Sequence, residues 1–274
     1  MNKMTVTIKT EQELERMRKA GKILALVHQT LKKEIKPGMS TWDVDHLGEE
    51  MIRSYGCEPS FLGLYGYPAS ICVSVNEEVV HGIPNKEHIL REGDIVSLDA
   101  GVKYKGYHAD AARTIPIGEV PREALLLIER TRQSFFEGIK KAISGNHLHD
   151  ISKAIGTYAE SFGYGVVRDL AGHGIGKELH EDPMIPNYKK IRRGIKLKPG
   201  MTLAIEPMIN MGTRNIVWMD DEWTVVTEDL SLSAHYENTI LITEGKPEIL
   251  TLSEEEIAEG IPEKIENKQT FRRE

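Results

Sequence analysis

The sequence predicts an α/β (α+β) protein built from two related halves. Amphipathic segments of helical length alternate with short apolar runs bounded by glycine and polar residues, a pattern typical of helices and strands in one chain. The 274 residues are 40% hydrophobic and 28% charged, an ordinary balance for one large globular domain or two small ones. A repeated spacing within the chain is the third observation.

Two pairs of similar segments recur at one offset. Gly56 and Gly163 each end a similar helical segment, and 163 − 56 = 107. Gly93 and Gly200 lie in the strings LREGDIVSLDAG and LKPGMTLAIEPM, where 200 − 93 is again 107. Chance agreement between common helix–strand patterns is the alternative. We expect a duplicated α/β unit whose halves meet face to face, with related carboxylates at the seam.

The first half reads as two helices followed by strands. Apolar residues at helical spacing predict a helix over 11–34, and Ser40 or Thr41 can cap a second helix that runs to about Gly56. The segment SICVSVNEEVVHGIP alternates around Asn76-Glu77 and predicts a hairpin. Residues 93–118 predict two more strands, joined by a turn near Lys105-Gly106.

The second half repeats this order. Residues 121–143 form a predicted helix opened by Pro121, and residues 149–162 a further helix. The strings TLAIEPMIN, TVVTED and NTILIT predict strands. We expect one domain over 1–252 and a charged tail over 253–274, with a short helix and a frayed end.

Charge and cysteine content indicate which partners and which cellular compartment to expect. The net charge of −7 gives no general attraction to nucleic acid. The two cysteines, Cys57 and Cys72, form no disulfide framework, and no segment has the pattern of a secretory leader or a membrane span. We therefore expect a cytoplasmic protein without a membrane partner.

Two aspartates lie in sequence that otherwise reads as buried strand. Asp99 and Asp110 flank one hairpin turn, so they can face each other on one side of the sheet. An isolated buried carboxylate is costly, and two like charges repel. A divalent cation between them removes both problems, whereas a turn or a solvated sheet edge is the ordinary alternative.

Three further residues favour a metal site. His173 lies among glycines in AGHGIGKELHEDP, Glu206 ends an apolar strand, and Glu237 begins another. The duplication offset also relates Glu206 to Asp99. Four carboxylates and one imidazole suit Mn, Fe, Co or Zn, and two metals can share bridging carboxylates. A glycine-loop histidine satisfied by backbone is the alternative for His173, and GHGIG lacks the full dinucleotide fingerprint.

The motifs VHGIP, SLDAG, YHADAART, GHGIG, LHEDP, IEPM and HYENT occur in order. Over roughly residues 8–250 the chain resembles a type I methionine aminopeptidase of the short bacterial form. The resemblance implies the pita-bread fold, in which a curved antiparallel sheet carries helices on its outer face. It also implies a monomeric cytoplasmic metalloaminopeptidase that removes methionine from nascent proteins with a small second residue, in transient contact with the ribosome.

The resemblance implies a role for each ligand. Asp99 and Glu237 hold the first of two divalent metal ions, and Asp110 contributes to both. His173 and Glu206 complete the second, with Glu237 bridging. By this resemblance, a hydroxide shared by the metals would attack the scissile carbonyl, and Glu206 is the candidate proton acceptor.

Two more histidines match the family's substrate contacts. His81, in VVHGIP, corresponds to the histidine that contacts the scissile amide and assists the leaving amine. His180, in LHEDP, corresponds to the one that binds the substrate carbonyl and stabilises the developing oxyanion. Structural hydrogen bonding is the alternative for both.

The methionine pocket is expected to be narrow and apolar. The expected walls are Phe61, Tyr67, Cys72 and Trp223. The sequence has Phe61 where the family often has cysteine, Leu64 where it often has tyrosine, and Leu179 where it often has phenylalanine. All three remain apolar, so they affect pocket shape. Plain core packing is the alternative, above all for Cys72.

Two rival functions stay open. A proline-specific aminopeptidase or X-Pro dipeptidase of the same fold usually carries a large N-terminal domain, and we expect none here because the first predicted helix begins near residue 11. A non-enzymatic peptide-binding module typically loses metal ligands, and all five are present here.

Overall fold

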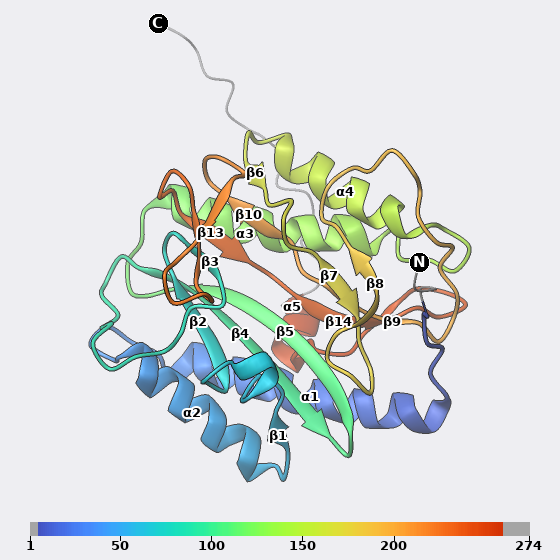
Figure 1. Cartoon of the computed structure of the whole chain (residues 1–274), viewed down its shortest axis with the longest axis horizontal. Coiled ribbons are helices and arrows are strands. Elements are labelled where there is room, and N and C mark those ends of the chain that lie inside the picture. The colour runs from blue at the N-terminus through green and yellow to red at the C-terminus, as the bar shows by residue number, and fades with distance from the viewer. Residues whose placement is uncertain (1–4, 260–274) are drawn as a thin grey trace, which may run out of the picture.

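A layer of strands lies between two pairs of helices (Figure 1). The computed structural model describes residues 5–259. Helices α1 (Glu11–Glu34) and α2 (Thr41–Ser54) cover one side of the layer, and α3 (Arg122–Ile139) and α4 (Leu148–Glu160) cover the other. Among the described residues, no helix combines the length and the apolar composition needed to cross a bilayer.

The first half packs its helices against a four-stranded antiparallel sheet. The sheet contains β1 (Glu58–Pro59), β2 (Ile71–Val75), β4 (Ile95–Tyr104) and β5 (Tyr107–Pro116). As predicted, β4 and β5 form a hairpin that turns at Lys105 and Gly106, both with positive φ. The side chain of Ser40 accepts a hydrogen bond from the backbone of Asp43 and so caps α2. The apolar faces of α1 and α2 are buried against β2, β4 and β5 in one core cluster.

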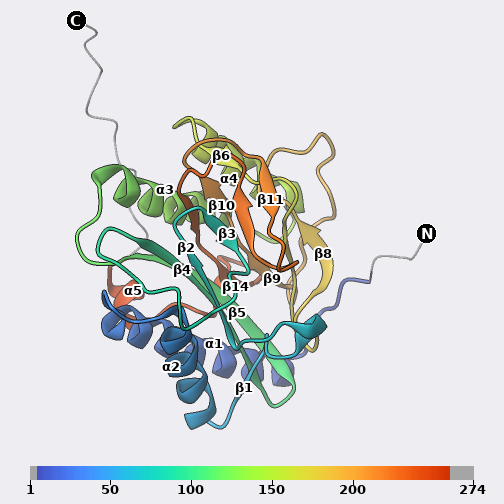
Figure 2. The same ribbon diagram turned by 60° about the vertical axis from the view of Figure 1, so that its left-hand side comes forward.

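The strands of the second half lie in three further sheets, one of which also includes β3 of the first half. A five-stranded sheet has the order β15 (Glu248–Ile249), β14 (Asn238–Leu241), β9 (Thr202–Ile205), β7 (Gly172–Gly174) and β8 (Glu181–Ile185). A three-stranded sheet has the order β13 (Ser233–His235), β10 (Met208–Asn210) and β6 (Gly165–Val166). The third sheet, visible at the front in Figure 2, has the order β11 (Ile216–Trp218), β12 (Val225–Thr227) and β3 (Glu78–Val80).

The offset found in the sequence recurs in the structure. Gly93 and Gly200 both have left-handed backbone, with φ of 98° and 84°. An isolated β-bridge joins Ser40 to Ile89, and a second joins His147 to Lys196. Each residue of the second bridge lies 107 positions after its counterpart in the first bridge, since 147 − 40 and 196 − 89 both equal 107. Helix α4 follows the second bridge as α2 follows the first, so the two halves share local geometry as well as spacing.

The long hairpin is repeated with a longer connection. Val96 pairs with Ile115 between β4 and β5, and Leu203 pairs with Ile240 between β9 and β14. Corresponding residues of β4 and β9, the first strands of the two hairpins, are again 107 positions apart (203 − 96), which we call the short offset. Corresponding residues of β5 and β14, the second strands, are 125 positions apart (240 − 115), which we call the long offset. The difference arises because the second hairpin has a longer connection. Strands β11 and β12 occupy the extended connection.

The halves meet where β5 lies beside residues 235–239. Ala112 and Glu237 exchange two main-chain hydrogen bonds, with N···O distances of 3.4 and 3.0 Å. The hydroxyl of Thr114 donates to the carbonyl of His235 and accepts from its N–H. Thr239 makes the same two bonds with the main chain of Asp110. Since Thr114 and Asp110 correspond to Thr239 and His235 at the long offset, the seam is a pseudo-twofold contact.

The hairpin predicted around Asn76-Glu77 is wrong in its pairing. The chain turns there, with Asn76 at a φ of 55°, but β2 pairs with β4 and β3 pairs with β12. Local alternation shows where strands lie and does not choose their partners. The short helix after Ser253 is confirmed as α5 (Glu254–Glu259). The expected frayed end lies outside the described residues, and the division into a 1–252 domain and a tail stays a prediction.

Candidate active site

A cavity of about 150 Å³ lies at the seam. It is lined by all eleven site residues expected from the sequence: Phe61, Tyr67, Cys72, His81, Asp99, Asp110, His173, His180, Glu206, Trp223 and Glu237. Leu64, Tyr65 and Leu179 complete the lining. Residues from both halves thus converge on one cavity.

The two aspartates share one face of the first hairpin. Asp99 on β4 pairs with Ala112, and Asp110 on β5 pairs with Gly101. The aspartates are therefore diagonal neighbours, not the directly opposed pair that the hairpin pattern allowed. Asp99 lies opposite Cys72 of β2, which brings a pocket wall beside the carboxylate.

The second half adds two glutamates and a histidine. Glu206 follows β9 and Glu237 precedes β14, and the next ladder pair joins Ile205 to Asn238. His173 on β7 pairs with Ala204. Its Nε2 atom lies 3.7 Å from an oxygen of Asp110 and 3.7 Å from an oxygen of Glu206. One ligand atom each of Asp110, His173 and Glu237 lies within 4.8 Å of the others.

Burial opposes ionisation of every carboxylate in this cluster. It raises the pKa of Asp99 to about 7 and raises the pKa values of Asp110, Glu206 and Glu237 well above their ordinary range, with mutual repulsion adding to the effect in these three. Among residues 5–259, one oxygen each of Asp99, Asp110 and Glu237 is buried without a hydrogen-bond partner. Such a cluster needs protons or cations to balance it.

The donor set fits divalent metal ions. Burial lowers the pKa of His173 to about 3, so its imidazole is neutral. Nδ1 lies 2.8 Å from the carbonyl of Gly174 and donates to it, which leaves the lone pair of Nε2 facing the carboxylates. Carboxylate oxygens with one neutral imidazole suit Mn, Fe, Co or Zn.

His81 and His180 flank the carboxylates. His81 follows β3 with a left-handed φ of 60°, and burial lowers its pKa to about 4. The ring of His180 stands edge-on to His173 at 4.5 Å between centroids, and burial lowers its pKa as well. Both imidazoles are therefore neutral near pH 7 and can each offer one N–H.

The other end of the cavity is apolar. Trp223 lies in the turn between β11 and β12 and contacts the ring of Tyr67 edge-on at 5.1 Å. The hydroxyl of Tyr67 donates to the carbonyl of Gly82 at 2.9 Å and is thereby fixed. Phe61, Cys72 and Leu179 belong to the same core cluster and are buried. Core packing and pocket formation coincide here.

Sequence reasoning missed two residues. His235 is buried, with Nε2 3.8 Å from Glu206 and 3.9 Å from Glu237. It lies in the quoted motif HYENT, and its position two residues before Glu237 was the signal available in the sequence. Tyr65, with a φ of 52°, stacks on His180 at 5.9 Å. No pattern in the sequence indicated that contact.

Comparison with known proteins agrees with this geometry. A sequence model of metallopeptidase family M24 matches residues 15–244. The methionine aminopeptidase of Clostridium acetobutylicum is 56% identical over 249 residues, which cover 91% of this chain and 100% of that protein. The crystal structure of methionine aminopeptidase from Thermotoga maritima has a TM-score of 0.89 and 47% identity, covering 91% of this chain and 100% of that one.

A proline-specific peptidase of known structure is similar to a lesser degree. Prolidase from Pyrococcus furiosus has a TM-score of 0.72 at 26% identity, and the match covers 66% of its length. The likeness to the aminopeptidases is closer and covers their full length. The pita-bread fold predicted from the sequence is confirmed. The chain therefore belongs to metallopeptidase family M24 and, within it, to the type I methionine aminopeptidases.

Proposed function

We propose that this protein hydrolyses the N-terminal methionine from peptides and nascent proteins whose second residue is small, with two divalent metal ions as cofactors. One observation carries the proposal: a buried cluster of four carboxylates and a neutral imidazole shares one cavity with a set of apolar walls. An exopeptidase needs this combination, because the side chain must be held while the adjacent peptide bond is cleaved.

Five residues would hold the metals: Asp99, Asp110, His173, Glu206 and Glu237. Their partnerless oxygens and raised carboxylate pKa values support this assignment. The ions, when bound, supply Lewis acidity and a water of lowered pKa. Bound cations would also keep the carboxylates ionised at neutral pH, since opposite charge lowers a carboxyl pKa. Co, Mn, Fe and Zn all suit the donor set.

The remaining polar groups would act on the peptide. Neutral His180 offers an N–H to the substrate carbonyl, where negative charge develops, and preorganised donors of this kind lower the barrier by a few kcal/mol. Neutral His81 is placed to contact the scissile amide and assist the departing amine. Glu206 lies between the two histidines, His173 and His235, and is the candidate proton acceptor.

The apolar walls would select methionine. Tyr67 and Trp223 form an edge-on pair with Phe61 and Cys72 beside them, and the cavity of about 150 Å³ limits the length of the side chain. Leu64 and Leu179 line the same cavity, so the departures from the family's common residues are expected to change inhibitor fit and spare the reaction. A thioether side chain also packs well against aromatic edges.

We place the reaction in the cytoplasm, on a monomeric enzyme in transient contact with the ribosome. The absence of a membrane-crossing helix among residues 5–259 is compatible with this setting. The substrate then meets the enzyme as a newly exposed chain terminus. These are proposals about setting and leave the chemistry unchanged.

The test is methionine release from Met-Ala-Ser by chelator-stripped protein, titrated with Mn, Co, Fe(II) or Zn. Ala-Pro-Ala under the same conditions is the control for a proline-specific peptidase. We expect release from the first peptide, restored by metal, and little from the second. Preference for Ala-Pro-Ala, or tight peptide binding with no cleavage under any metal, would contradict the proposal.

A further inference from the structure

Arg113 crosses the seam directly behind a proposed metal ligand. It lies on β5 next to Ala112, and its alternating position sends its side chain to the face opposite Asp110. Its guanidinium donates to the carbonyl oxygens of Glu237 at 2.5 Å and of Ala112 at 2.8 Å. These two carbonyls belong to the residues whose main chains join the halves. The guanidinium therefore fixes the backbone of Glu237 from behind.

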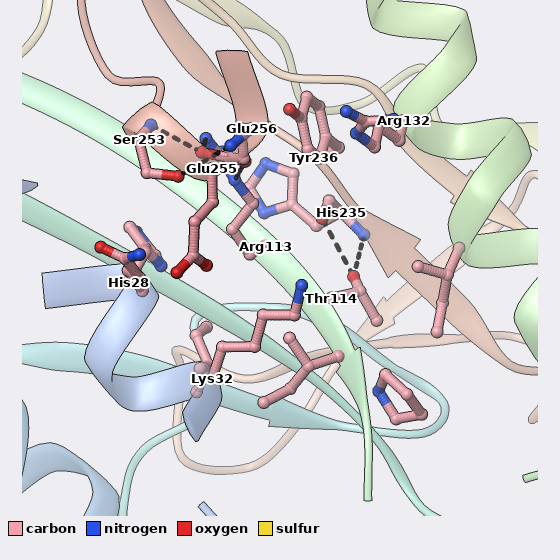
Figure 3. Close-up of a pocket in the computed structure, with 15 residues that line it drawn as sticks. His28, Lys32, Arg113, Thr114, Arg132, His235, Tyr236, Ser253, Glu255 and Glu256 are labelled. Carbon is pink, nitrogen blue, oxygen red and sulfur yellow. Dashed lines mark hydrogen bonds and ion pairs between the residues drawn. The ribbon is translucent and has the colours of Figure 1, made fainter. Parts of the chain in front are cut away.

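The same guanidinium is held by the C-terminal helix. Figure 3 shows Arg113 beside Glu256 and Ser253, in a second cavity of about 230 Å³ on the back of the sheet. The Nε atom of Arg113 donates to Oε1 of Glu256 at 2.7 Å, and this ion pair is largely buried, with side-chain exposures of 11% and 20%. Further bonds run from Arg113 to the side chain of Asn238 and the carbonyl of Thr251.

Glu256 is itself held by a capping box. The backbone N–H of Ser253 donates to Oε2 of Glu256 at 2.9 Å, and the N–H of Glu256 donates to the hydroxyl of Ser253 at 3.1 Å. Burial alone would raise the pKa of Glu256, but the charge and hydrogen bonds of Arg113 outweigh it and lower the pKa to about 2. The neighbouring Glu255 has a different partner, Lys33 of α1, on an exposed surface.

The other charged groups around this cavity do not replace Glu256. Lys32 and Arg132 also line it and are cationic, and His28 and His235 are neutral because burial lowers the pKa of each to about 3. Glu255 lines the cavity as well, but its carboxylate pairs with Lys33. The carboxylate that hydrogen-bonds Arg113 within the described range 5–259 is that of Glu256. Loss of its charge would leave the buried guanidinium of Arg113 without a carboxylate partner, a costly arrangement.

We propose that α5 is a positioning element of the active site: Glu256 holds Arg113, and Arg113 holds the main chain of Glu237 at the seam. The inference rests on the proposed function, since it concerns a ligand of the proposed metal site. Helix α5 begins after residue 244, where the match to the family model ends. It thus couples a segment outside that match to the metal centre.

The test compares Glu256→Gln with Glu255→Gln in the full chain. The first removes the charge that faces Arg113, and the second removes an equal charge one residue away, from an exposed carboxylate that lines the same cavity but pairs with Lys33. We expect Mn affinity, measured by calorimetry on metal-stripped protein, to fall about 10- to 100-fold in Glu256→Gln, the usual range for groups that orient a ligand. Glu255→Gln should stay within about twofold of wild type by the same comparison.

Two additional measurements separate positioning from general stability. Circular dichroism at the assay temperature establishes that each variant is folded, and Co(II) absorption reports the ligand environment directly. If Glu256→Gln does not fold, Glu256→Asp takes its place, because the shorter side chain keeps the charge but draws the carboxylate back from Arg113. A loss of Mn affinity in folded Glu256→Asp would support the proposal.

A folded Glu256→Gln, or its Glu256→Asp substitute, with wild-type Mn affinity and Co(II) spectrum would overturn the inference. Methionine release by the wild type is measured in parallel. If the wild type releases methionine and the variants keep wild-type Mn affinity, the role of α5 is refuted and the proposed function stands. A wild type that binds Mn and releases no methionine refutes the proposed substrate, while the affinity comparison still decides the role of α5. A wild type that binds no metal refutes both.

Discussion

Replacing Asp99 with asparagine should stabilise the metal-free protein at alkaline pH. Asp99 is buried on β4, and burial raises its pKa from the ordinary value of 3.8 to about 7. A carboxyl group with a raised pKa in the folded state keeps its proton while the unfolded chain loses it. The folded state then binds more protons than the unfolded state, so the free energy of unfolding falls as pH rises.

The magnitude follows from the pKa. Stability from this group is fully present below pH 3.8, declines by ~1.4 kcal/mol per pH unit, and is lost once the pH passes about 7. Between pH 5 and pH 8 the wild-type contribution should therefore fall by about 3 kcal/mol. Asp99→Asn removes this titration and the repulsion that Asp99 exerts on Asp110 and Glu206, so both effects act in one direction.

The assay is urea unfolding of chelator-treated wild type and Asp99→Asn at pH 5 and pH 8. We expect the free energy of unfolding of the variant, relative to that of the wild type, to rise by about 3 kcal/mol from pH 5 to pH 8. This change does not depend on the difference between the two proteins at pH 5. With saturating Mn at pH 8, the wild type should be the more stable of the two proteins, because the variant has lost a metal ligand. An equal pH dependence in both metal-free proteins would refute the argument that burial opposes the charge of Asp99.

The remaining predictions concern turnover. Asp110→Ala and His173→Ala should each abolish methionine release while circular dichroism shows a retained fold; residual turnover near wild type would remove either residue from the ligand set. His81→Ala should lower kcat by about 10²-fold or more and leave metal content unchanged by elemental analysis, and loss of metal would contradict its role beside the scissile amide. Trp223→Ala should raise KM for Met-Ala-Ser more than it lowers kcat, since it removes a wall of the cavity; an unaltered KM would mean that Trp223 only packs against Tyr67.

Helices were predictable because their signals are local. The segment 11–34 carries its own apolar stripe, and Ser40 forms the capping box that its spacing from Asp43 allows. Strand partners depend on residues far along the chain. The alternation around Asn76 marked two strands, yet β3 pairs with β12, where Val80 meets Val225 from the other half. No local pattern carries that information.

The candidate site was predictable from residue types, since carboxylates are unusual in buried strands and a family resemblance supported their order. The groups behind it were not. Arg113 in YHADAART reads as an ordinary basic residue, and Glu256 as the last of three consecutive glutamates in a charged tail. Their partnership exists only after the fold has brought β5 and α5 together, where Arg113 also bonds to Asn238 and Thr251. Buried ion pairs of this kind are products of the fold, so composition conceals them.

The duplication explains both the symmetry of the seam and the asymmetry of the chemistry. The short offset relates Asp99 to Glu206, but the long offset relates Asp110 to His235 and Ala112 to Glu237. Ala112 and Glu237 face each other across the pseudo-twofold contact, where the small alanine leaves room for one carboxylate. The extended connection of the second hairpin carries Trp223 to one side of the cavity. A peptide has a direction, so a site that binds its terminus needs unlike ends, and divergence of the halves after duplication supplies them.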